Sequence, residues 1–204
     1  MITIWNFQRG ARGVRVFWVC EEMGLAYTPV AVSFPPSADY KARKPLGSVP
    51  FLEDEGGVRI NESVAMMLYL ADRYGPTPLL PAGDAAARAK VIQLTVFGET
   101  TLGGYMNPLM MTKFGAPATA DKQNWTVAAL ESRLGDAMSF VAAALGSGPY
   151  LAGDAFTLAD ISVSCALDMW TGALGKEVPA ALSAWHARVK GRDAYKRAAA
   201  AQTR

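Results

Sequence analysis

The chain is poor in histidine and cysteine, the two residue types that most often build catalytic triads and metal sites. His186 is the single histidine among 204 residues, which leaves almost no material for a histidine-based triad or a multi-histidine metal centre. The two cysteines, Cys20 and Cys165, are far apart in the sequence and form no metal-binding or redox motif. We therefore expect inert thiols, no metal and no redox cofactor.

Long apolar runs and an excess of one charge are also absent. The longest unbroken apolar run covers residues 64–71, far short of the roughly 20 residues that span a bilayer. Residues 1–7 lack the basic and apolar regions of a signal peptide, so we expect a cytoplasmic protein with no membrane partner. Twenty basic and 18 acidic residues give a net charge of +2 without clustering, which argues against nucleic-acid binding.

Short alternating strands and helices are predicted for residues 1–76, the first expected domain. Residues 16–23 place apolar side chains at helical spacing, and residues 64–71 do the same before Gly75-Pro76. Acidic and glycine residues at 54–57 indicate a hairpin between two short strands. The predicted order is strand, helix, strand, helix, strand, strand, helix, which is an α/β arrangement.

Residues 77–84 are rich in proline and glycine and are predicted to be a linker. After them alanine and leucine dominate and no alternating apolar run occurs, so residues 85–204 are predicted to form an all-helical bundle domain. Its expected helices cover residues 85 to about 112, 121–145, 158 to about 171, and 180–201. Thr157 and Asp160 have the spacing of a capping box, so we interpret Asp160 as structural.

Val49-Pro50 stands at the start of the predicted strand at 51–53. If the peptide bond is cis, the backbone N–H and C=O of Val49 face outward and can pair with a peptide ligand. A trans proline in an ordinary edge strand is the alternative interpretation.

Glu62-Ser63 stands at the start of the last helix of the first domain. A helix N-terminus attracts a carboxylate, Ser63 can add its hydroxyl to that carboxylate, and Glu62 can hold an ammonium group. Alternatively, Asn61 is an N-cap and Glu62 a favourable first-turn acid, and the segment only begins a helix.

The order of these two motifs, within an α/β domain followed by an all-helical domain, resembles the cytosolic glutathione S-transferase family. The segments Arg15–Tyr27 and Phe156–Ser162 are also similar to that family, and the resemblance covers nearly the whole chain. It implies a thioredoxin-like N-terminal domain in which Val49 and Pro50 bind the cysteinyl part of glutathione. It further implies that Glu62 and Ser63 bind the γ-glutamyl part.

The family's usual thiolate-stabilising hydroxyl or thiol is missing from this chain. Aligned on Arg15, the serine-type position falls on Ala11, the cysteine-type position near Arg12, and the tyrosine-type position near Asn6. Arg12 is our first candidate for stabilising the thiolate and Asn6 the second, with Gln8 and Arg12 as further glutathione-binding residues. A solvated surface arginine is the alternative for Arg12.

The electrophile pocket is expected around Tyr105, Met106 and Met110, near Met111 and Pro108. Methionine and aromatic side chains suit an adaptable apolar pocket, although stripes of this kind also form plain core.

The predicted function is transfer of the glutathione thiolate to a small apolar electrophile, a detoxification chemistry, with glutathione as co-substrate and no cofactor. The alternatives are a glutathione-transferase-like ligand-binding protein without catalysis, or a glutathione-dependent isomerase or peroxidase. The resemblance implies a homodimer, and Met66 and Tyr69 are expected to lie off the main core face of their helix.

Overall fold

The computed structural model describes residues 1–9 and 12–202, and the chain divides into two compact units. The first comprises Met1–Ala82 together with Val189–Arg204, and the second comprises Gly83–Arg188. The segment from residue 189 onward therefore belongs with the N-terminal unit, whereas we expected it within a helical domain at 85–204.

The first unit is built on a mixed four-stranded sheet in the order β2-β1-β3-β4. Its strands are β1 (Ile2–Asn6), β2 (Tyr27–Ala31), β3 (Phe51–Asp54) and β4 (Val58–Ile60). β1 runs parallel to β2 and antiparallel to β3, and β3 is antiparallel to β4. Between β3 and β4 the chain makes a single 3₁₀ turn, in which Gly56 and Gly57 have φ of 73° and 78°, values that favour glycine.

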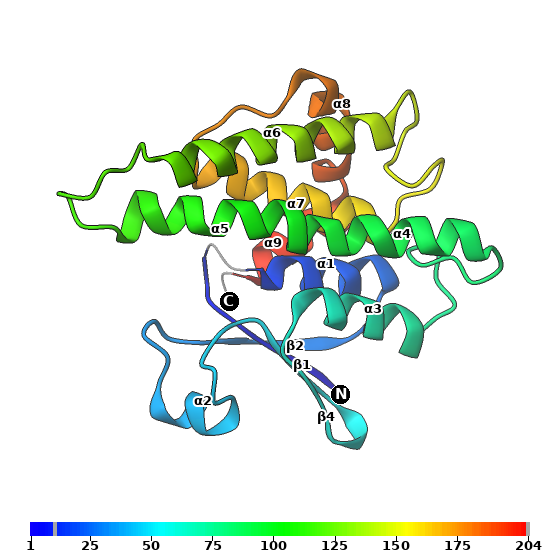
Figure 1. Ribbon diagram of the computed structural model, residues 1–204. Helices are drawn as coiled ribbons and strands as arrows, with labels where there is room; N and C mark the ends of the chain where they lie inside the picture. Colours follow the sequence, from blue (N-terminus) through cyan, green and yellow to red (C-terminus); the bar gives the residue numbers. More distant parts are fainter. Residues whose placement is uncertain (10–11, 203–204) are drawn as a thin grey trace. The chain divides into compact units, whose positions relative to one another are not determined.

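Helices cover both faces of this sheet (Figure 1). They are α1 (Gly13–Met23) and α3 (Ser63–Arg73) on one face, and α2 (Ala38–Arg43) on the other, while α9 (Asp193–Ala201) packs on α1. Alternate residues of β1 point to the two faces, so Ile2 and Ile4 are buried beneath α1 and α3. Trp5 lies on the face of α2, where its ring lies 5.9 Å from that of Tyr40.

The second unit is all-helical, as predicted. Its elements are α4 (Ala85–Phe97), α5 (Gly104–Met110), α6 (Trp125–Leu145), α7 (Leu158–Gly172) and most of α8 (Ala180–Lys190). Two π-helical segments, Gly98–Gly103 and Met111–Gly115, continue α4 and α5 as one helical stretch. The first ten residues of α7 are all buried, so this helix lies at the centre of the unit. The fold class, a thioredoxin-like domain with a helical domain, is therefore confirmed.

Two expected helices differ from those observed. α6 begins at Trp125 rather than at residue 121, because the Asn124 side chain accepts a hydrogen bond from the N–H of Val127 and caps the helix there. The helix expected at 180–201 is divided between α8 and α9, because Arg192 is extended, with ψ of 137°. Arg192 binds Glu22 of α1 through two hydrogen bonds of 2.6 and 2.7 Å, which anchors the chain at this break.

Met66 and Tyr69 of α3 were both expected to lie off the core face of their helix. Met66 is fully buried in α3, so our prediction that it lies off the core face was wrong; Tyr69 is only partly buried, and its hydroxyl donates to Asp54. A methionine in a helical pattern can lie inside a broad apolar stripe or at its border, and packing decides which position is buried.

Within residues 1–9 and 12–202, none of the helices combines the length and apolarity that crossing a bilayer requires.

Gly98 marks the closest approach of the α4 stretch to α7. A Cβ at this position would lie 2.5 Å from Oγ and 2.9 Å from the backbone carbon of Ser162, whose hydroxyl donates to the carbonyl of Thr95. We expect Gly98→Ala to lower the free energy of unfolding by about 2–3 kcal/mol, because backbone atoms must move apart. Urea unfolding followed by circular dichroism measures this change.

Gly135, inside α6, is the matched control. A Cβ there meets nothing within 4 Å, so Gly135→Ala should raise stability by about 0.5–1 kcal/mol through helix propensity alone. Equal effects of the two substitutions would show that the close approach at Gly98 is not a constraint.

Candidate functional site

The candidate site is at one end of the sheet of the first unit, where the strand register brings the two sequence motifs together. Leu52 pairs with Ile60 in antiparallel register, so the segment just before β3 and the segment just after β4 lie at the same end of this strand pair. Val49-Pro50 belongs to the first segment and Glu62-Ser63 to the second. Trp5 pairs with Phe51, so the end of β1 at Asn6 lies at this end of the sheet as well.

The Val49-Pro50 peptide bond is cis. Val49 is half-buried and lies two residues before Phe51. Phe51 is the first residue of β3, and the pairing of β3 with β1 ends there. Its backbone N–H and C=O make no hydrogen bond with the described residues. This is the arrangement in which a short peptide can pair with the backbone at Val49.

Two side chains hold the loop that leads to Pro50. The hydroxyl of Tyr40 donates to the carbonyl of Ser48 at 2.8 Å, and Nζ of Lys44 donates to the carbonyl of Pro50 at 3.1 Å. Lys44 is 2% exposed, an unusual environment for a lysine. Burial lowers the pKa of Lys44, and the negative charge of Glu62 opposes that shift.

Lys44 had no role in the sequence-based prediction. A lysine beside a proline in a loop is normally solvated, and nothing in the local pattern indicates burial. The negative charge of Glu62 acts on the ammonium of Lys44. Lys44 lies before Pro50 and Glu62 lies before α3, so this interaction connects the Val49-Pro50 loop with the start of α3.

The N-terminus of α3 presents free backbone amides. Glu62 is the N-cap residue, with φ of −96° and ψ of 125°, and its side chain makes no capping hydrogen bond. The alternative in which Asn61 caps this helix is therefore wrong. Because N–H groups in the first turn have no intrahelical acceptor, they and the helix dipole favour an anion. The Glu62 side chain is exposed and Ser63 is buried.

A buried arginine joins α1 to α3. Arg15 is 1% exposed, and its Nη1 lies 3.4 Å from Oγ of Ser63. Arg15 had no predicted role beyond marking the segment that resembles the family. Its position in the first turn of α1, on the apolar side of that helix, was the available signal that its guanidinium is buried.

The loop between β1 and α1 carries the predicted thiolate-stabilising residues. Arg12 is half-buried at the N-cap of α1, while Gln8 and Arg9 are exposed. Ala11, on which the serine-type position falls, lies outside the described residues, as does Gly10. Helix N-termini lower the pKa of nearby thiols, so the location of Arg12 suits the role predicted for it.

Asn6 ends β1 and packs beneath the first turn of α1. Its Nδ2 donates to the carbonyl of Phe7 at 2.9 Å, whereas its buried Oδ1 has no hydrogen-bond partner among residues 1–9 and 12–202. A Cβ on Gly13 would overlap the Asn6 amide group, so glycine is required for this close packing. The catalytic role of Asn6 stays a prediction.

Cys20 is buried in α1, as its place on the apolar stripe predicts. Burial, followed by the charges of Glu21 and Asp54, raises the pKa of the Cys20 thiol to about 12. At neutral pH it is therefore a protonated core residue and not a nucleophile.

The residues expected to form the electrophile pocket belong to the second unit. Tyr105 and Met110 are partly exposed, and Met106 is fully buried. Asn107 and Pro108 between them continue the helix without a break.

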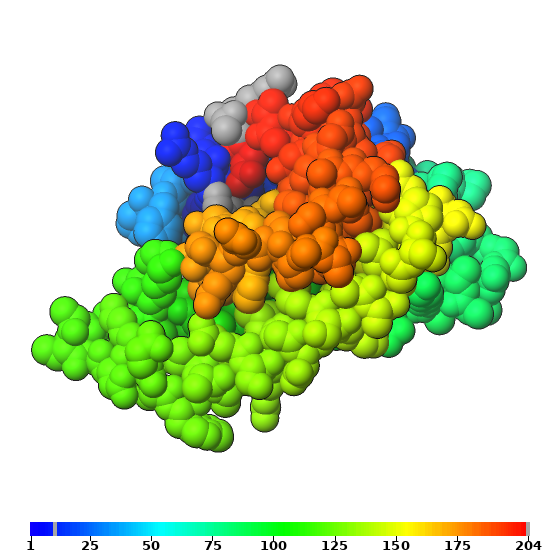
Figure 2. All heavy atoms as spheres, turned by 90° about the horizontal axis from the view of Figure 1, so that it is seen from above, coloured from blue at the N-terminus to red at the C-terminus, as the bar shows by residue number. Residues whose placement is uncertain are grey.

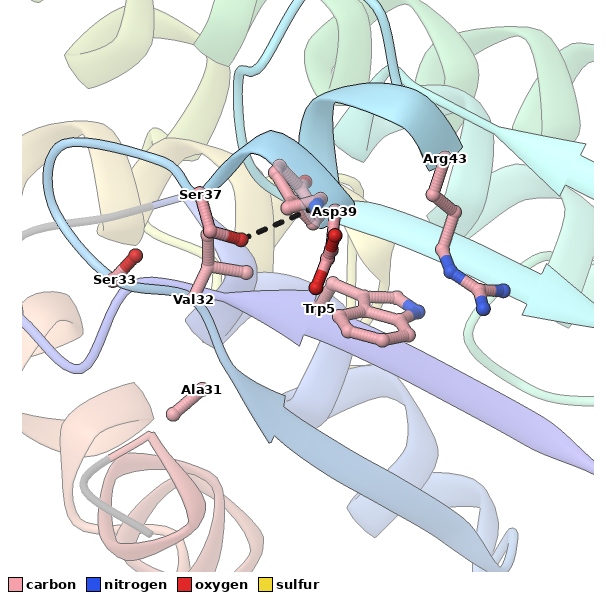
Figure 3. Close-up of a pocket in the computed structure, with 8 residues that line it drawn as sticks. Trp5, Ala31, Val32, Ser33, Ser37, Asp39 and Arg43 are labelled. Atoms are coloured by element: carbon pink, nitrogen blue, oxygen red, sulfur yellow. Dashed lines mark hydrogen bonds between the residues drawn. The ribbon is translucent and has the colours of Figure 1, made fainter.

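A separate hollow of about 310 Å³ lies on the α2 side of the sheet (Figure 3). Trp5, Asp39 and Arg43 line it, and the predicted glutathione-binding residues do not. Two of its polar groups already have partners, because Ser37 caps α2 and Arg43 pairs with Glu53 at 2.9 Å.

Comparisons with known proteins agree with this geometry. The family model of the glutathione S-transferase N-terminal domain matches residues 12–73, and that of the C-terminal domain matches residues 124–188. Glutathione S-transferase GstA of Escherichia coli O157:H7 is 31% identical over 160 residues, which cover 76% of this chain and 75% of GstA. Elongation factor 1-gamma of Schizosaccharomyces pombe is 35% identical over 133 residues; these are 64% of this chain but only 31% of that protein.

Solved structures of glutathione S-transferases superpose on nearly the whole chain. The theta class glutathione S-transferase of Xanthomonas axonopodis pv. citri, with glutathione bound, superposes with a TM-score of 0.80 at 31% identity, covering 97% of this chain and 96% of that one. The bacterial glutathione S-transferase BphK, in a ternary complex, gives a TM-score of 0.83 at 27% identity, covering 98% of each chain. The protein belongs to the glutathione S-transferase family.

Proposed function

We propose that the protein binds glutathione at the end of the sheet in its first unit and transfers the glutathione thiolate to a small apolar electrophile. One observation carries this proposal: the backbone at Val49 and the N-terminus of α3 at Glu62-Ser63, which has no side-chain cap, lie at the same end of the β3–β4 strand pair. The backbone at Val49 suits an extended peptide. The N-terminus of α3 suits an anion, with the Glu62 carboxylate available for a neighbouring ammonium group.

Each group of the site has a role in this proposal. Val49 pairs with the cysteinyl backbone, the first-turn amides of α3 and the Ser63 hydroxyl bind the γ-glutamyl carboxylate, and Glu62 binds its ammonium. Arg12 and Gln8 contact the peptide from the β1–α1 loop. Lys44 stabilises the Val49-Pro50 loop through the carbonyl of Pro50.

The reaction needs no resident metal or redox cofactor. The glutathione thiol loses its proton, and the sulfur electron pair forms a bond to an electrophilic carbon. With a chloronitroarene the C–Cl bond breaks and chloride leaves with the bonding pair. The positive end of α1 and the Arg12 guanidinium favour the thiolate. Tyr105, Met106 and Met110 are proposed to line the electrophile pocket, and we propose a homodimer.

Glutathione binding tests the proposal. Glu62→Gln removes the charge that holds the ligand ammonium, so isothermal titration calorimetry should show at least tenfold weaker binding of glutathione, about 1.4 kcal/mol. Glu55→Gln is the matched control, because Glu55 is an exposed acid of the same unit and, in the part of the chain that the structure describes, its carboxylate pairs only with the amino terminus. Equal affinities for the two variants would refute the assignment of Glu62.

A second candidate function is glutathione binding without catalysis. The observation that favours it is the absence of serine, cysteine and tyrosine from residues 6–9 and 12–13 of the described loop. Glutathione binding with no turnover of 1-chloro-2,4-dinitrobenzene or of a wider panel of electrophiles would support this second function.

A further inference from the structure

The hollow of about 310 Å³ on the α2 side of the sheet is separate from the proposed glutathione site, since none of the residues assigned to glutathione lines it. It lies within the first unit, where α2, the end of β2 and Trp5 of β1 contribute its lining. Figure 2 shows the light blue segment that contains α2 at the surface. Asp39 and Arg43 of that helix are exposed, so a ligand can reach the hollow from solvent.

Two charged side chains of α2 line this hollow without pairing with each other. Asp39 and Arg43 are four residues apart, a spacing at which a carboxylate and a guanidinium commonly form an ion pair on a helix. Instead, Nη1 of Arg43 donates to both carboxylate oxygens of Glu53 at 2.9 Å. The carboxylate of Asp39 has no hydrogen bond or ion pair with any residue that the structure describes. Figure 3 shows both side chains extending from α2 toward Trp5.

The guanidinium of Arg43 is held in place and still has donors to offer. Glu53 fixes it from one side, and its central carbon lies 5.0 Å from the centre of the Trp5 ring. Nε1 of Trp5 also donates to Glu53, at 3.0 Å, so the indole is fixed by the same carboxylate. Among the described residues, the hydrogen bonds of Arg43 use Nη1 alone, which leaves the N–H groups of Nε and Nη2 for an anion. A preorganised cation of this kind binds an anion at a lower entropic cost.

The rest of the lining is largely apolar. Val32 and Tyr40 are buried in one hydrophobic cluster, against which the half-buried Trp5 packs. The rings of Trp5 and Tyr40 lie 5.9 Å apart, and Ala31 completes the apolar side. The hollow therefore combines an apolar surface with one carboxylate and one guanidinium.

We propose that this hollow binds a free α-amino acid with a small aliphatic side chain. The ligand ammonium donates to Asp39, the ligand carboxylate accepts from Arg43, and the side chain lies against Trp5 and Val32. An α-amino acid carries both charged groups on one carbon atom, so it bridges the two side chains that do not pair with each other. The volume is at the lower end of the range of small-molecule sites, which favours a ligand of this size.

The test uses three probes of nearly the same shape. L-leucine carries both charges, 4-methylpentanoate lacks the ammonium group, and 3-methylbutylamine lacks the carboxylate. Nuclear magnetic resonance titration of the full chain, followed at the Trp5 indole N–H and the amides of residues 31–43, measures binding at this place. We expect leucine to bind about fivefold more tightly than either analogue, because an exposed ion pair contributes up to about that factor.

Two variants separate the two charged contacts. Asp39→Asn should bind leucine and 4-methylpentanoate equally, because the contact to the ammonium is lost. Arg43→Gln should bind leucine and 3-methylbutylamine equally, because the contact to the carboxylate is lost. Arg133→Gln/Asp136→Asn is the control, since it removes the same two charges at exposed positions of α6 and should keep both preferences. Thermal melting verifies that each variant is folded.

The same titrations show whether leucine binds at the proposed γ-glutamyl position instead. Shifts confined to the start of α3 and abolished by Glu62→Gln would overturn the inference. Unchanged preferences in both α2 variants, or no binding of leucine to the wild type, would overturn it as well. Binding of leucine at the hollow does not depend on the proposed glutathione chemistry, so either proposal can fail while the other stands.

Discussion

Replacing Asp160 by asparagine is expected to lower the free energy of unfolding by about 3–4 kcal/mol. Asp160 is fully buried at the start of α7, and its carboxylate accepts four hydrogen bonds. Oδ1 accepts from the N–H of Leu151 at 3.0 Å and from Nε1 of Trp185 at 2.8 Å. Oδ2 accepts from the N–H of Thr157 at 2.9 Å and from its hydroxyl at 3.2 Å.

Asparagine has the same shape but only one acceptor oxygen. Its NH₂ group would face either the N–H and hydroxyl of Thr157 or the N–H groups of Leu151 and Trp185, so one or two buried N–H donors lose their acceptor. Each such group costs about 1–3 kcal/mol. Burial raises the pKa of Asp160, and the four hydrogen bonds act in the opposite direction.

Urea unfolding and hydrogen exchange of the amides of α7 measure the effect. Asp154→Asn, an exposed aspartate six residues earlier, is the matched control and should change stability by less than about 0.5 kcal/mol. If the two variants unfold at the same urea concentration, the four hydrogen bonds of Asp160 do not stabilise the unit as we infer.

The second large effect concerns catalysis and depends on the proposed function. Arg12→Ala is expected to lower kcat/KM for 1-chloro-2,4-dinitrobenzene about 100-fold, the effect of removing one preorganised group that stabilises developing negative charge. Arg12 is the N-cap residue of α1, at the positive end of the helix dipole. Without it, the thiol of bound glutathione should ionise at a higher pH.

The ultraviolet absorbance of the thiolate, titrated against pH in the binary complex, measures that ionisation directly. We expect the thiol pKa to rise by about 1–2 units in Arg12→Ala and by less in Arg12→Lys, which keeps a positive charge. Arg9→Ala is the control, because Arg9 is an exposed arginine of the same loop. A thiol pKa that stays the same in Arg12→Ala removes Arg12 from the mechanism and makes Asn6 the next residue to test.

Much of the fold followed from short-range patterns. The 3.6-residue spacing of apolar side chains in α1, α3, α6 and α7 predicted those helices, since each must bury one face. The turn at Glu55–Gly57 was predicted from its acidic and glycine residues, and both of its glycines have positive φ. The capping box of Thr157 and Asp160 is present as predicted, because it depends on residues only three positions apart.

The prediction was wrong where packing decides between local options. The periodic segment 180–201 is compatible with one helix, but the chain is extended at Arg192, where its guanidinium binds Glu22, 170 residues away. Met66 is buried although its position in the helical pattern allowed exposure. These outcomes depend on neighbours that are distant in sequence and therefore leave no local signal.

The sequence by itself determined the family, the alternation of elements in the first unit, the helical nature of the second, and the two motifs at Val49-Pro50 and Glu62-Ser63. Only the tertiary structure decided that strand register brings these motifs to the same end of the β3–β4 strand pair, and that the N-terminus of α3 has no side-chain cap. It also revealed the buried Lys44 and Arg15. The physical reason is that periodicity and capping are local properties, whereas burial of a charge depends on which segments surround it after folding.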